Sequence, residues 1–367
     1  MPIRILLALL LAATLRVEAP QTTAYQEVFV HRGPGHTFHD IARLNPGVPV
    51  HIIERNRVGN WVRVTRTTDN GTVVLDGWVP TGYLNYDGSF HLSEIPVNTT
   101  IADADPANAD YVSTGKLYAV PLISEVSRAM QGVYRYGQAL GKRSNVVTKV
   151  GDSVSTNSLY LNPMSRGDHE LGPYDFLEET INFFGPSLAA GSVASRIGMT
   201  TYVIFDPLWA DKEHCNPGET PLACEYRIKQ PAIAMILFGP NDVRHMTDAE
   251  FAVQMREIVE QSLDQGVIPV LSTFSVHPDD RLWWQAINFN LRLTEISAEY
   301  EVPLINFWAA SRILPEYGLD VDGIHVANSG FPNIKFSTGH EVWYGTSLQN
   351  LLAIRMLDEL RRTLDMH

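Results

Sequence analysis

Four side chains of this chain have the types that nucleophilic catalysis on a carbonyl group requires, and each follows an apolar segment: Ser153, Asn241, Asp322 and His325. A serine hydroxyl is a weak nucleophile at neutral pH and needs an adjacent base. A histidine that a carboxylate holds in one tautomer is such a base. The oxyanion that forms on the attacked carbonyl needs fixed N–H donors. The set therefore predicts acyl transfer.

The motifs around these residues are "GDSVSTN", "FGPND" and "DGIH". Glycine, aspartate, asparagine and serine are ordinary turn formers, so each motif taken alone also fits a surface turn. Taken together and in this order, they favour chemistry. Ser153 is the candidate nucleophile, His325 the general base and Asp322 the carboxylate that orients it. The side-chain amide of Asn241 and the backbone N–H of Ser153 would hold the oxyanion.

The elements that must position these residues are strands alternating with helices. Buried parallel strands are predicted where short apolar runs are bounded by turn residues, at 144–151, 232–239, 266–274 and 302–308. Helices are predicted at 247–266, 283–301 and 347–364, the first opening with Thr247 and Glu250 in the spacing of a capping box. This order predicts a doubly wound α/β domain at 119–367, in which ligands bind at the carboxyl ends of the strands.

The same three motifs resemble blocks I, III and V of the GDSL/SGNH hydrolases, a superfamily of esterases and lipases with a flavodoxin-like parallel sheet. The resemblance covers about 145–360 and follows the family's order and spacing. It implies that Ser153 is the nucleophile, His325 the base and Asp322 its partner. It also implies an oxyanion hole made of the Ser153 amide, Asn241 and a glycine from block II.

Block II departs from the family pattern. The region between blocks I and III, "FFGPSLAAGSVASRIGMT", offers Gly185, Gly191 and Gly198. We choose Gly191, which small residues flank, as the third oxyanion donor. Block I also departs slightly, because valine stands where the fuller motif has leucine.

Residues 25–87 are predicted to form a separate, small all-β domain. Short runs rich in β-branched and aromatic residues alternate there with turn clusters. "VHRGPGHTF", "GNWVRV" and "GWVPTGYL" resemble a bacterial SH3-like barrel. Such domains bind cell-wall glycopeptide or act as spacers, and Trp61 and Trp78 fit either a ligand site or the core. Residues 88–118, rich in Asp, Ala, Asn and Pro, are predicted to be a linker.

Two features point to export. Residues 1–19 combine Arg4, an apolar run of about a dozen residues and small residues, as a signal peptide does; a buried N-terminal helix is the alternative. Cys215 and Cys224 are the only cysteines, and in an exported protein they most simply form one disulfide. A secreted or extracytoplasmic location in the cell envelope follows, and no later segment approaches transmembrane length.

The charge of the chain limits which classes of partner it can bind. The net charge is −13, from 41 acidic and 28 basic residues, which argues against nucleic acid or an anionic membrane. The mechanism needs no metal and no organic cofactor. The leading hypothesis is a secreted serine esterase that acts on an acylated cell-wall or other polysaccharide. A lipase or lysophospholipase of the same fold is the alternative, and so is a non-catalytic wall-binding protein on a hydrolase scaffold.

Overall fold

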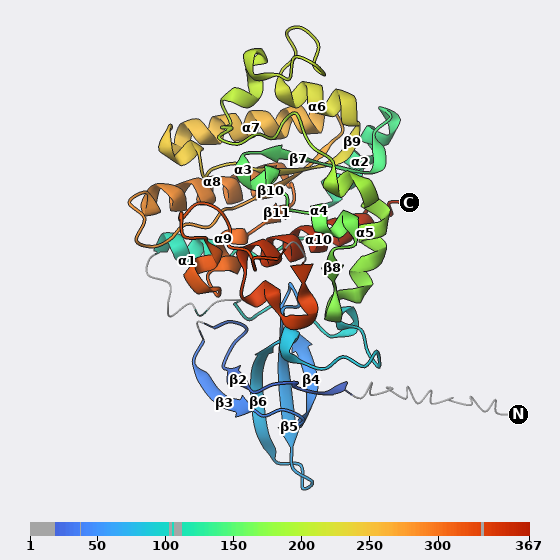
Figure 1. The fold of residues 1–367 in the computed structure, drawn as a ribbon, viewed down its shortest axis with the longest axis vertical. Helices are drawn as coiled ribbons and strands as arrows, with labels where there is room; N and C mark the ends of the chain where they lie inside the picture. The colour runs from blue at the N-terminus through green and yellow to red at the C-terminus, as the bar shows by residue number, and fades with distance from the viewer. Residues whose placement is uncertain (1–18, 37, 103–104, 106–111, 332–333) are drawn as a thin grey trace, which may run out of the picture.

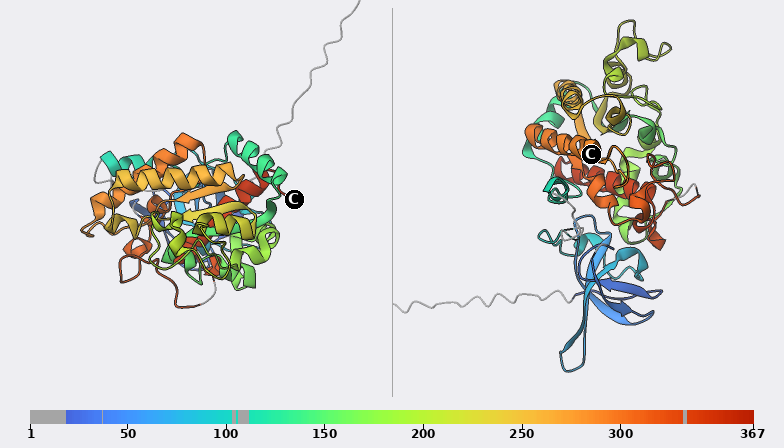
Figure 2. Two further views of the ribbon diagram at one scale, coloured as in Figure 1. Left: turned by 90° about the horizontal axis from the view of Figure 1, so that it is seen from above. Right: turned by 90° about the vertical axis from the view of Figure 1, so that its left-hand side faces the viewer.

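The computed structural model describes residues 19–36, 38–102, 105, 112–331 and 334–367. The predicted signal peptide at 1–19 lies outside the described residues apart from Ala19. Within the described ranges, no helix has both the length and the apolar character needed to cross a bilayer. The chain forms a β domain and an α/β domain, and the β domain lies below the α/β domain in the view of Figure 1 (Figures 1 and 2).

The β domain is a six-stranded antiparallel sheet in the order β1-β4-β5-β6-β2-β3. Its strands are β1 (Gln21–Thr23), β2 (Val28–His31), β3 (Asp40–Leu44), β4 (Pro49–Arg55), β5 (Trp61–Thr67) and β6 (Val73–Pro80). Trp61 on β5 and Trp78 on β6 are buried, so both rings belong to the core of the domain. The predicted small SH3-like β domain is therefore present, and β1 extends its sheet to residue 21.

Part of the segment 88–118 packs against the β domain. The backbone N–H of Arg55 donates to the carbonyl of Pro96 at 2.9 Å, and the N–H of Asn98 donates back to the carbonyl of Arg55 at 2.8 Å. The segment ends in α1 (Val112–Tyr118), which packs on the α/β domain against α8 (Trp283–Tyr300) and α9 (Phe307–Ser311). The residues expected to form a linker therefore contribute to both domains.

The α/β domain is built on a parallel sheet in the order β11-β10-β9-β7. These strands are β7 (Arg143–Gly151), β9 (Pro231–Leu237), β10 (Ile268–Ser272) and β11 (Leu304–Ile305), and two short strands, β8 (His169–Glu170) and β12 (Ile334–Lys335), pair elsewhere. The remaining helices are α2 (Arg128–Ala139), α3 (Ser153–Thr156), α4 (Asn162–Arg166), α5 (Glu178–Phe184), α6 (Pro221–Lys229), α7 (Asp248–Asp264) and α10 (Gly345–Thr363). Every residue of β9 and β10 is buried, as the apolar runs predict for strands covered on both faces.

The far edge of β7 carries one more parallel contact. Gly151 donates its N–H to the carbonyl of Ala194 at 3.1 Å and accepts from the N–H of Arg196 at 3.1 Å, so Ser195 forms an isolated parallel bridge with Gly151. The chain therefore leaves β7 toward this edge first and returns on the other side as β9. This is the predicted doubly wound, flavodoxin-like order, and its switch point lies at the end of β7.

The helix that follows β9 shows why the local sequence predicts its element well. Thr247 caps α7, because its hydroxyl accepts from the N–H of Glu250 while the Glu250 carboxylate accepts from the N–H of Thr247 at 2.8 Å. α8 begins at the predicted Trp283 and α10 two residues before the predicted Ser347. These helices pack on the sheet through their buried faces, with α7 and α8 against β10 and α10 against β11.

The two domains meet through buried polar groups. The hydroxyl of Tyr174 lies 3.2 Å from the carbonyl oxygen of Gly59 and 3.0 Å from the hydroxyl of Thr81, both in the β domain. It also lies 3.2 Å from the carboxyl of Glu341, which is fully buried. The Gly82 and Gly339 backbones approach so closely that a Cβ on Gly82 would stand 2.2 Å from the Gly339 Cα. The join is therefore a packed interface.

Candidate active site

The end of β7 presents Ser153 at the switch point of the sheet. Gly151 is required there, because a Cβ would lie 2.1 Å from the carbonyl oxygen of Leu237. Asp152 caps α3, and its carboxylate accepts the N–H of Val154 at 2.9 Å. Ser153 is the first residue of α3 and is half-buried. The "GDSVST" motif thus forms a tight strand-to-helix turn with the serine at its apex.

The loop that precedes β12 brings the second half of the site. Asp322 accepts the backbone N–H groups of Ile324 and His325 at 2.9 Å each, which folds the "DGIH" motif into a turn. Gly323, at φ 68°, supplies the left-handed residue that this turn needs. The turn places the ring of His325 beside the carboxylate of Asp322, three positions earlier in the chain. The local backbone therefore positions this pair.

The structure brings Ser153, His325 and Asp322 into one hydrogen-bonded line. The His325 Nδ1 lies 2.6 Å from the Asp322 Oδ2, and its Nε2 lies 2.8 Å from the Ser153 Oγ. With the proton of the ring on Nδ1 and donated to Asp322, Nε2 can accept from the serine hydroxyl. The side chains of His325 and Asp322 are 41% and 45% exposed, so a large substrate can reach the line.

The Asp322 carboxylate suits the role of an ionised partner. Partial burial raises its pKa, but hydrogen bonds from the His325 ring and from the Ile324 and His325 amides outweigh that effect. Its pKa therefore lies below the ordinary value, and Asp322 is ionised at neutral pH. An ionised carboxylate at Nδ1 stabilises an imidazolium when the ring takes a proton.

Asn241 reaches the same place from the end of β9. The Asn241 Nδ2 donates to the Oδ2 of Asp152 at 3.0 Å. Asp152 is the residue directly before Ser153. Asp152 is completely buried. Burial and the nearby charge of Asp242 raise the pKa of its carboxyl to about 7, although the hydrogen bonds from Val154 and Asn241 lower it. One N–H of the Asn241 amide is thus held by Asp152, which leaves the second N–H for another acceptor.

The predicted block II residue, Gly191, is exposed and lies on the loop that ends in the Ser195 bridge. The contacts that tie this loop to the end of β7 come from Ala194 and Arg196. No contact tests the oxyanion role of Gly191, which stays a prediction.

A buried carboxylate anchors this loop from behind. Glu225 on α6 accepts the N–H of Val193 at 2.8 Å and the hydroxyl of Thr148 on β7. Its pKa is raised, chiefly by burial. The sequence carries no signal for this pairing, because the partners lie far apart in the chain and Glu225 stands in an ordinary helical pattern.

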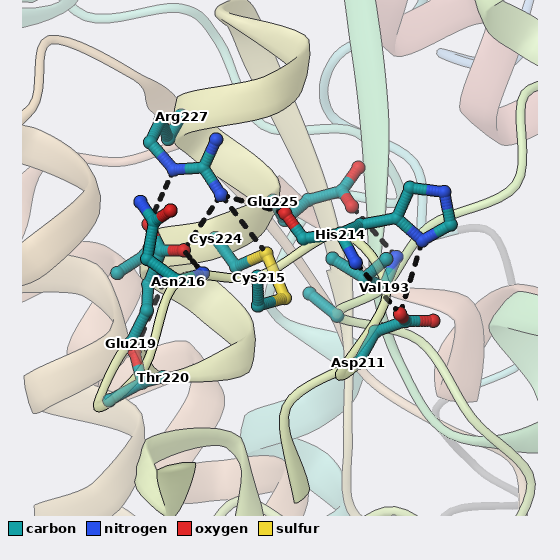
Figure 3. The surroundings of a disulfide bond; sticks show 12 residues. Val193, Asp211, His214, Cys215, Asn216, Glu219, Thr220, Cys224, Glu225 and Arg227 are labelled. Atoms are coloured by element: carbon teal, nitrogen blue, oxygen red, sulfur yellow. Dashed lines mark hydrogen bonds and ion pairs between the residues drawn. A yellow bond between two sulfur atoms is a disulfide. The ribbon is translucent and has the colours of Figure 1, made fainter.

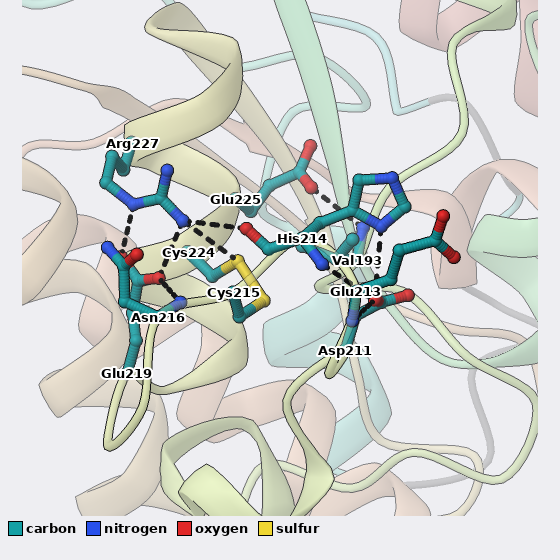
Figure 4. A network of polar contacts seen from close by, with 10 residues as sticks. All are labelled: Val193, Asp211, Glu213, His214, Cys215, Asn216, Glu219, Cys224, Glu225 and Arg227. Carbon is teal, nitrogen blue, oxygen red and sulfur yellow. Dashed lines mark hydrogen bonds and ion pairs between the residues drawn. A yellow bond between two sulfur atoms is a disulfide. The ribbon is translucent and has the colours of Figure 1, made fainter.

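The predicted disulfide joins Cys215 and Cys224 and closes the turn that leads into α6 (Figure 3). Around it, Arg227 donates through Nε and Nη2 to the carboxylate of Glu219 at 2.8 Å each, and through Nη2 to the carbonyl of His214 at 2.9 Å (Figure 4). In the part of the chain that the structure describes, Cys215, Glu219 and Cys224 are the only group placed as metal ligands would be. The sulfurs of the two cysteines are bonded to each other, so this group fixes the preceding turn to α6.

Residues 27–85 match the family model described as bacterial SH3 domain, and no curated protein matches the chain significantly. The similar solved structures include a lipase/acylhydrolase from Enterococcus faecalis, 18% identical with a TM-score of 0.39, over 59% of this chain and 95% of that one. They also include a psychrotrophic esterase from Pseudoalteromonas sp. (16%, TM-score 0.37, 60% and 99%) and an acetyl-xylooligosaccharide esterase from Geobacillus (15%, TM-score 0.38, 57% and 93%).

Residues 27–85, which match the bacterial SH3 domain model, are joined to an α/β domain whose similar solved structures include GDSL-like lipases, acylhydrolases and esterases.

Proposed function

We propose that this protein is a secreted serine esterase that hydrolyses carboxylic esters through an acyl-enzyme, acting on an acetylated cell-wall or other polysaccharide. The observation that carries the proposal is the continuous line from Ser153 Oγ to His325 Nε2 and from His325 Nδ1 to Asp322 Oδ2. A scaffold that had lost its chemistry would have no reason to keep all three groups in hydrogen-bonding order, which counts against a purely wall-binding role.

In the first half of the reaction, the Ser153 oxygen bonds to the acyl carbon as its proton passes to His325 Nε2. The carbonyl oxygen takes up negative charge and accepts from the free Asn241 N–H and the Ser153 amide, with Gly191 as the predicted third donor. The C–O bond to the alcohol then breaks, and His325 returns the proton to the departing alkoxide. Asp322 holds the ring throughout.

In the second half, water takes the place of the alcohol. His325 accepts one water proton as the water oxygen bonds to the acyl carbon, and the bond to the Ser153 oxygen breaks. The proton returns to the serine, and the free acid leaves. The cycle consumes one ester and one water and uses no group from outside the chain.

Residues next to the line in the chain also line two small cavities. One, of about 20 Å³, is lined by Ile324, next to His325 in sequence, together with Pro240 and Phe274. The other, of about 10 Å³, is lined by Val154, next to Ser153 in sequence, and by buried core residues. Ser153, Asp322 and His325 line neither cavity, so the ester series below decides between an acetylesterase and a lipase or lysophospholipase.

The SH3 domain, the disulfide and the N-terminal sequence support an extracytoplasmic setting for this activity. In that setting the SH3 domain would bind wall material or space the α/β domain from it.

The test is hydrolysis of a p-nitrophenyl ester series from acetate to palmitate by the wild type and by Ser153→Ala, with the exposed Ser158→Ala as control. We expect turnover of the short esters by the wild type and the control, and a loss of about a thousandfold or more in Ser153→Ala. Equal activity of wild type and Ser153→Ala would show that Ser153 is not the nucleophile.

A further inference from the structure

A third, larger cavity is lined in part by the turn that follows Asn241, and it has no part in the mechanism. It has a volume of about 580 Å³, within the range of small-molecule sites. Its walls come from the loop after the Ser195 bridge and from α7 with its preceding turn: Gly198, Thr200, Tyr202, Val203, Trp209, His245, Met246, Glu250 and Gln254. Tyr202 is 66% exposed and Trp209 41% exposed, so two large rings face solvent here.

Two short connections tie this cavity to residues beside Asn241 and Ser153. Thr201, between two lining residues, donates its N–H and its hydroxyl to Asp242 at 2.7 Å each, and Asp242 follows Asn241. In the same segment, the guanidinium of Arg196 lies 5.9 Å from the ring centre of Trp209, while the backbone N–H of Arg196 donates to the carbonyl of Gly151. The segment that carries Tyr202 and Trp209 is therefore fixed to the ends of β7 and β9, close to Ser153 and Asn241.

The lining combines aromatic faces with polar groups. Tyrosine and tryptophan rings are amphipathic surfaces on which the C–H faces of a sugar ring can pack. Glu250, His245 and Gln254 supply a carboxylate, an imidazole and an amide on the opposite wall, all able to bond hydroxyl groups. An aliphatic chain in the same place would cover those polar groups without replacing their bonds to water, which is costly.

We propose that this cavity is a carbohydrate subsite, in which Tyr202 and Trp209 stack on sugar rings of the polysaccharide whose ester Ser153 cleaves. The inference rests on the proposed esterase function and specifies its alcohol side. Tyr202 and Trp209 act as binding residues for the polymer, outside the reacting atoms.

The first experiment compares Tyr202→Ala and Trp209→Ala with the wild type on O-acetylated xylooligosaccharides, O-acetylated muropeptides and p-nitrophenyl acetate. We expect the KM for the glycan ester to rise roughly tenfold, as the loss of one stacking contact implies, with a far smaller effect on p-nitrophenyl acetate. Tyr136→Ala is the control, because Tyr136 is 50% exposed on α2 and does not line the cavity. A proportional loss on all substrates, or no loss on any, would overturn the subsite.

A second measurement separates this inference from the esterase proposal. Calorimetric titration of Ser153→Ala with xylohexaose and chitohexaose needs no turnover, and binding that Tyr202→Ala weakens would support the subsite even if the wild type proved inert. If the wild type cleaves p-nitrophenyl acetate but Ser153→Ala binds neither oligosaccharide, the esterase proposal stands and the subsite is wrong.

Discussion

Asn241 donates its side-chain amide to the buried carboxylate of Asp152, 3.0 Å away, and Asp152 directly precedes Ser153 in the chain. The group proposed to polarise the carbonyl is thus oriented by the neighbour of the proposed nucleophile. The bond joins the ends of β7 and β9 where their side chains are proposed to act on the same carbonyl group, Ser153 on its carbon and Asn241 on its oxygen. This bond gives Asp152 a positioning role that its place in the motif does not reveal.

Replacing Asp152 should therefore lower turnover more than binding. In Asp152→Ala the Asn241 amide loses its acceptor, and we expect kcat to fall, at most by the 10²–10³-fold seen when an oxyanion donor is removed, with little change in KM. Asp152→Asn keeps an oxygen acceptor and should recover part of the loss. Steady-state kinetics of the three proteins on p-nitrophenyl acetate, with circular dichroism to verify folding, checks this. Wild-type kcat in Asp152→Ala would refute the role.

The Asp322 carboxylate should be needed for catalysis but not for folding, because its side chain is nearly half exposed. Asp322→Asn can no longer hold Nδ1 in the protonated tautomer, and we expect kcat to fall by about 10²–10⁴-fold with an unchanged melting temperature. Asp320→Asn, an exposed neighbour in the same loop, serves as the matched control. Similar rates for the two variants would remove Asp322 from the mechanism.

Glu341 should make stability depend on pH. Burial raises the pKa of its carboxyl to about 8, despite the hydrogen bond from Tyr174, from an ordinary value of 4.5. The folded protein therefore holds this proton more tightly than the unfolded chain, so the stabilisation is complete below pH 4.5 and is lost as the pH rises through 8. The ceiling is about 1.4 kcal/mol per pH unit.

Thermal melts across this range should show a steeper decline in the wild type than in Glu341→Gln, which stays neutral and can still accept from Tyr174. Glu359→Gln, at an exposed carboxyl of α10, is the control and should follow the wild type. Parallel curves for the wild type and Glu341→Gln would contradict the prediction.

Reduction of the disulfide should destabilise the α6 region. The bridge spans nine positions, and cross-linking a loop of that size removes about 2–3 kcal/mol of unfolded-state entropy. Because α6 also carries Glu225, which binds Val193, we expect esterase activity to fall at temperatures well below global unfolding. Dithiothreitol should lower the melting temperature of the wild type but not of a Cys215→Ala/Cys224→Ala variant. An identical response of both proteins would exclude the bridge as the cause.

The sequence predicts those parts of the fold whose signals are local. The capping box of Thr247 and Glu250 marks the start of α7, and the apolar run of β9 marks a strand buried on both faces. The "GDS" and "DGIH" motifs are turns that carry their own hydrogen bonds, so the placement of Ser153 and His325 at one edge of the sheet could be expected from them.

The features that the sequence does not predict are contacts between residues that lie far apart in the chain. The second edge of β7 is completed by a single bridge at Ser195, too short to leave a strand pattern. Glu225 reaches Val193 only after α6 has docked, and α1 lies in a stretch whose composition is that of a linker. Tyr174 and Glu341 show no sign in sequence of the interface that they share.

The buried interface between the two domains fixes the distance and orientation of one domain relative to the other. Because Tyr174 bonds the β domain directly and Gly82 packs on Gly339, the orientation of one domain to the other is a property of the fold. An enzyme on a flexible tether samples every ester within a radius of its anchor. If the SH3 domain binds the polymer on which Ser153 is proposed to act, the serine stands at one fixed distance and angle from the bound unit, and only acyl groups at a matching spacing along that polymer can reach it.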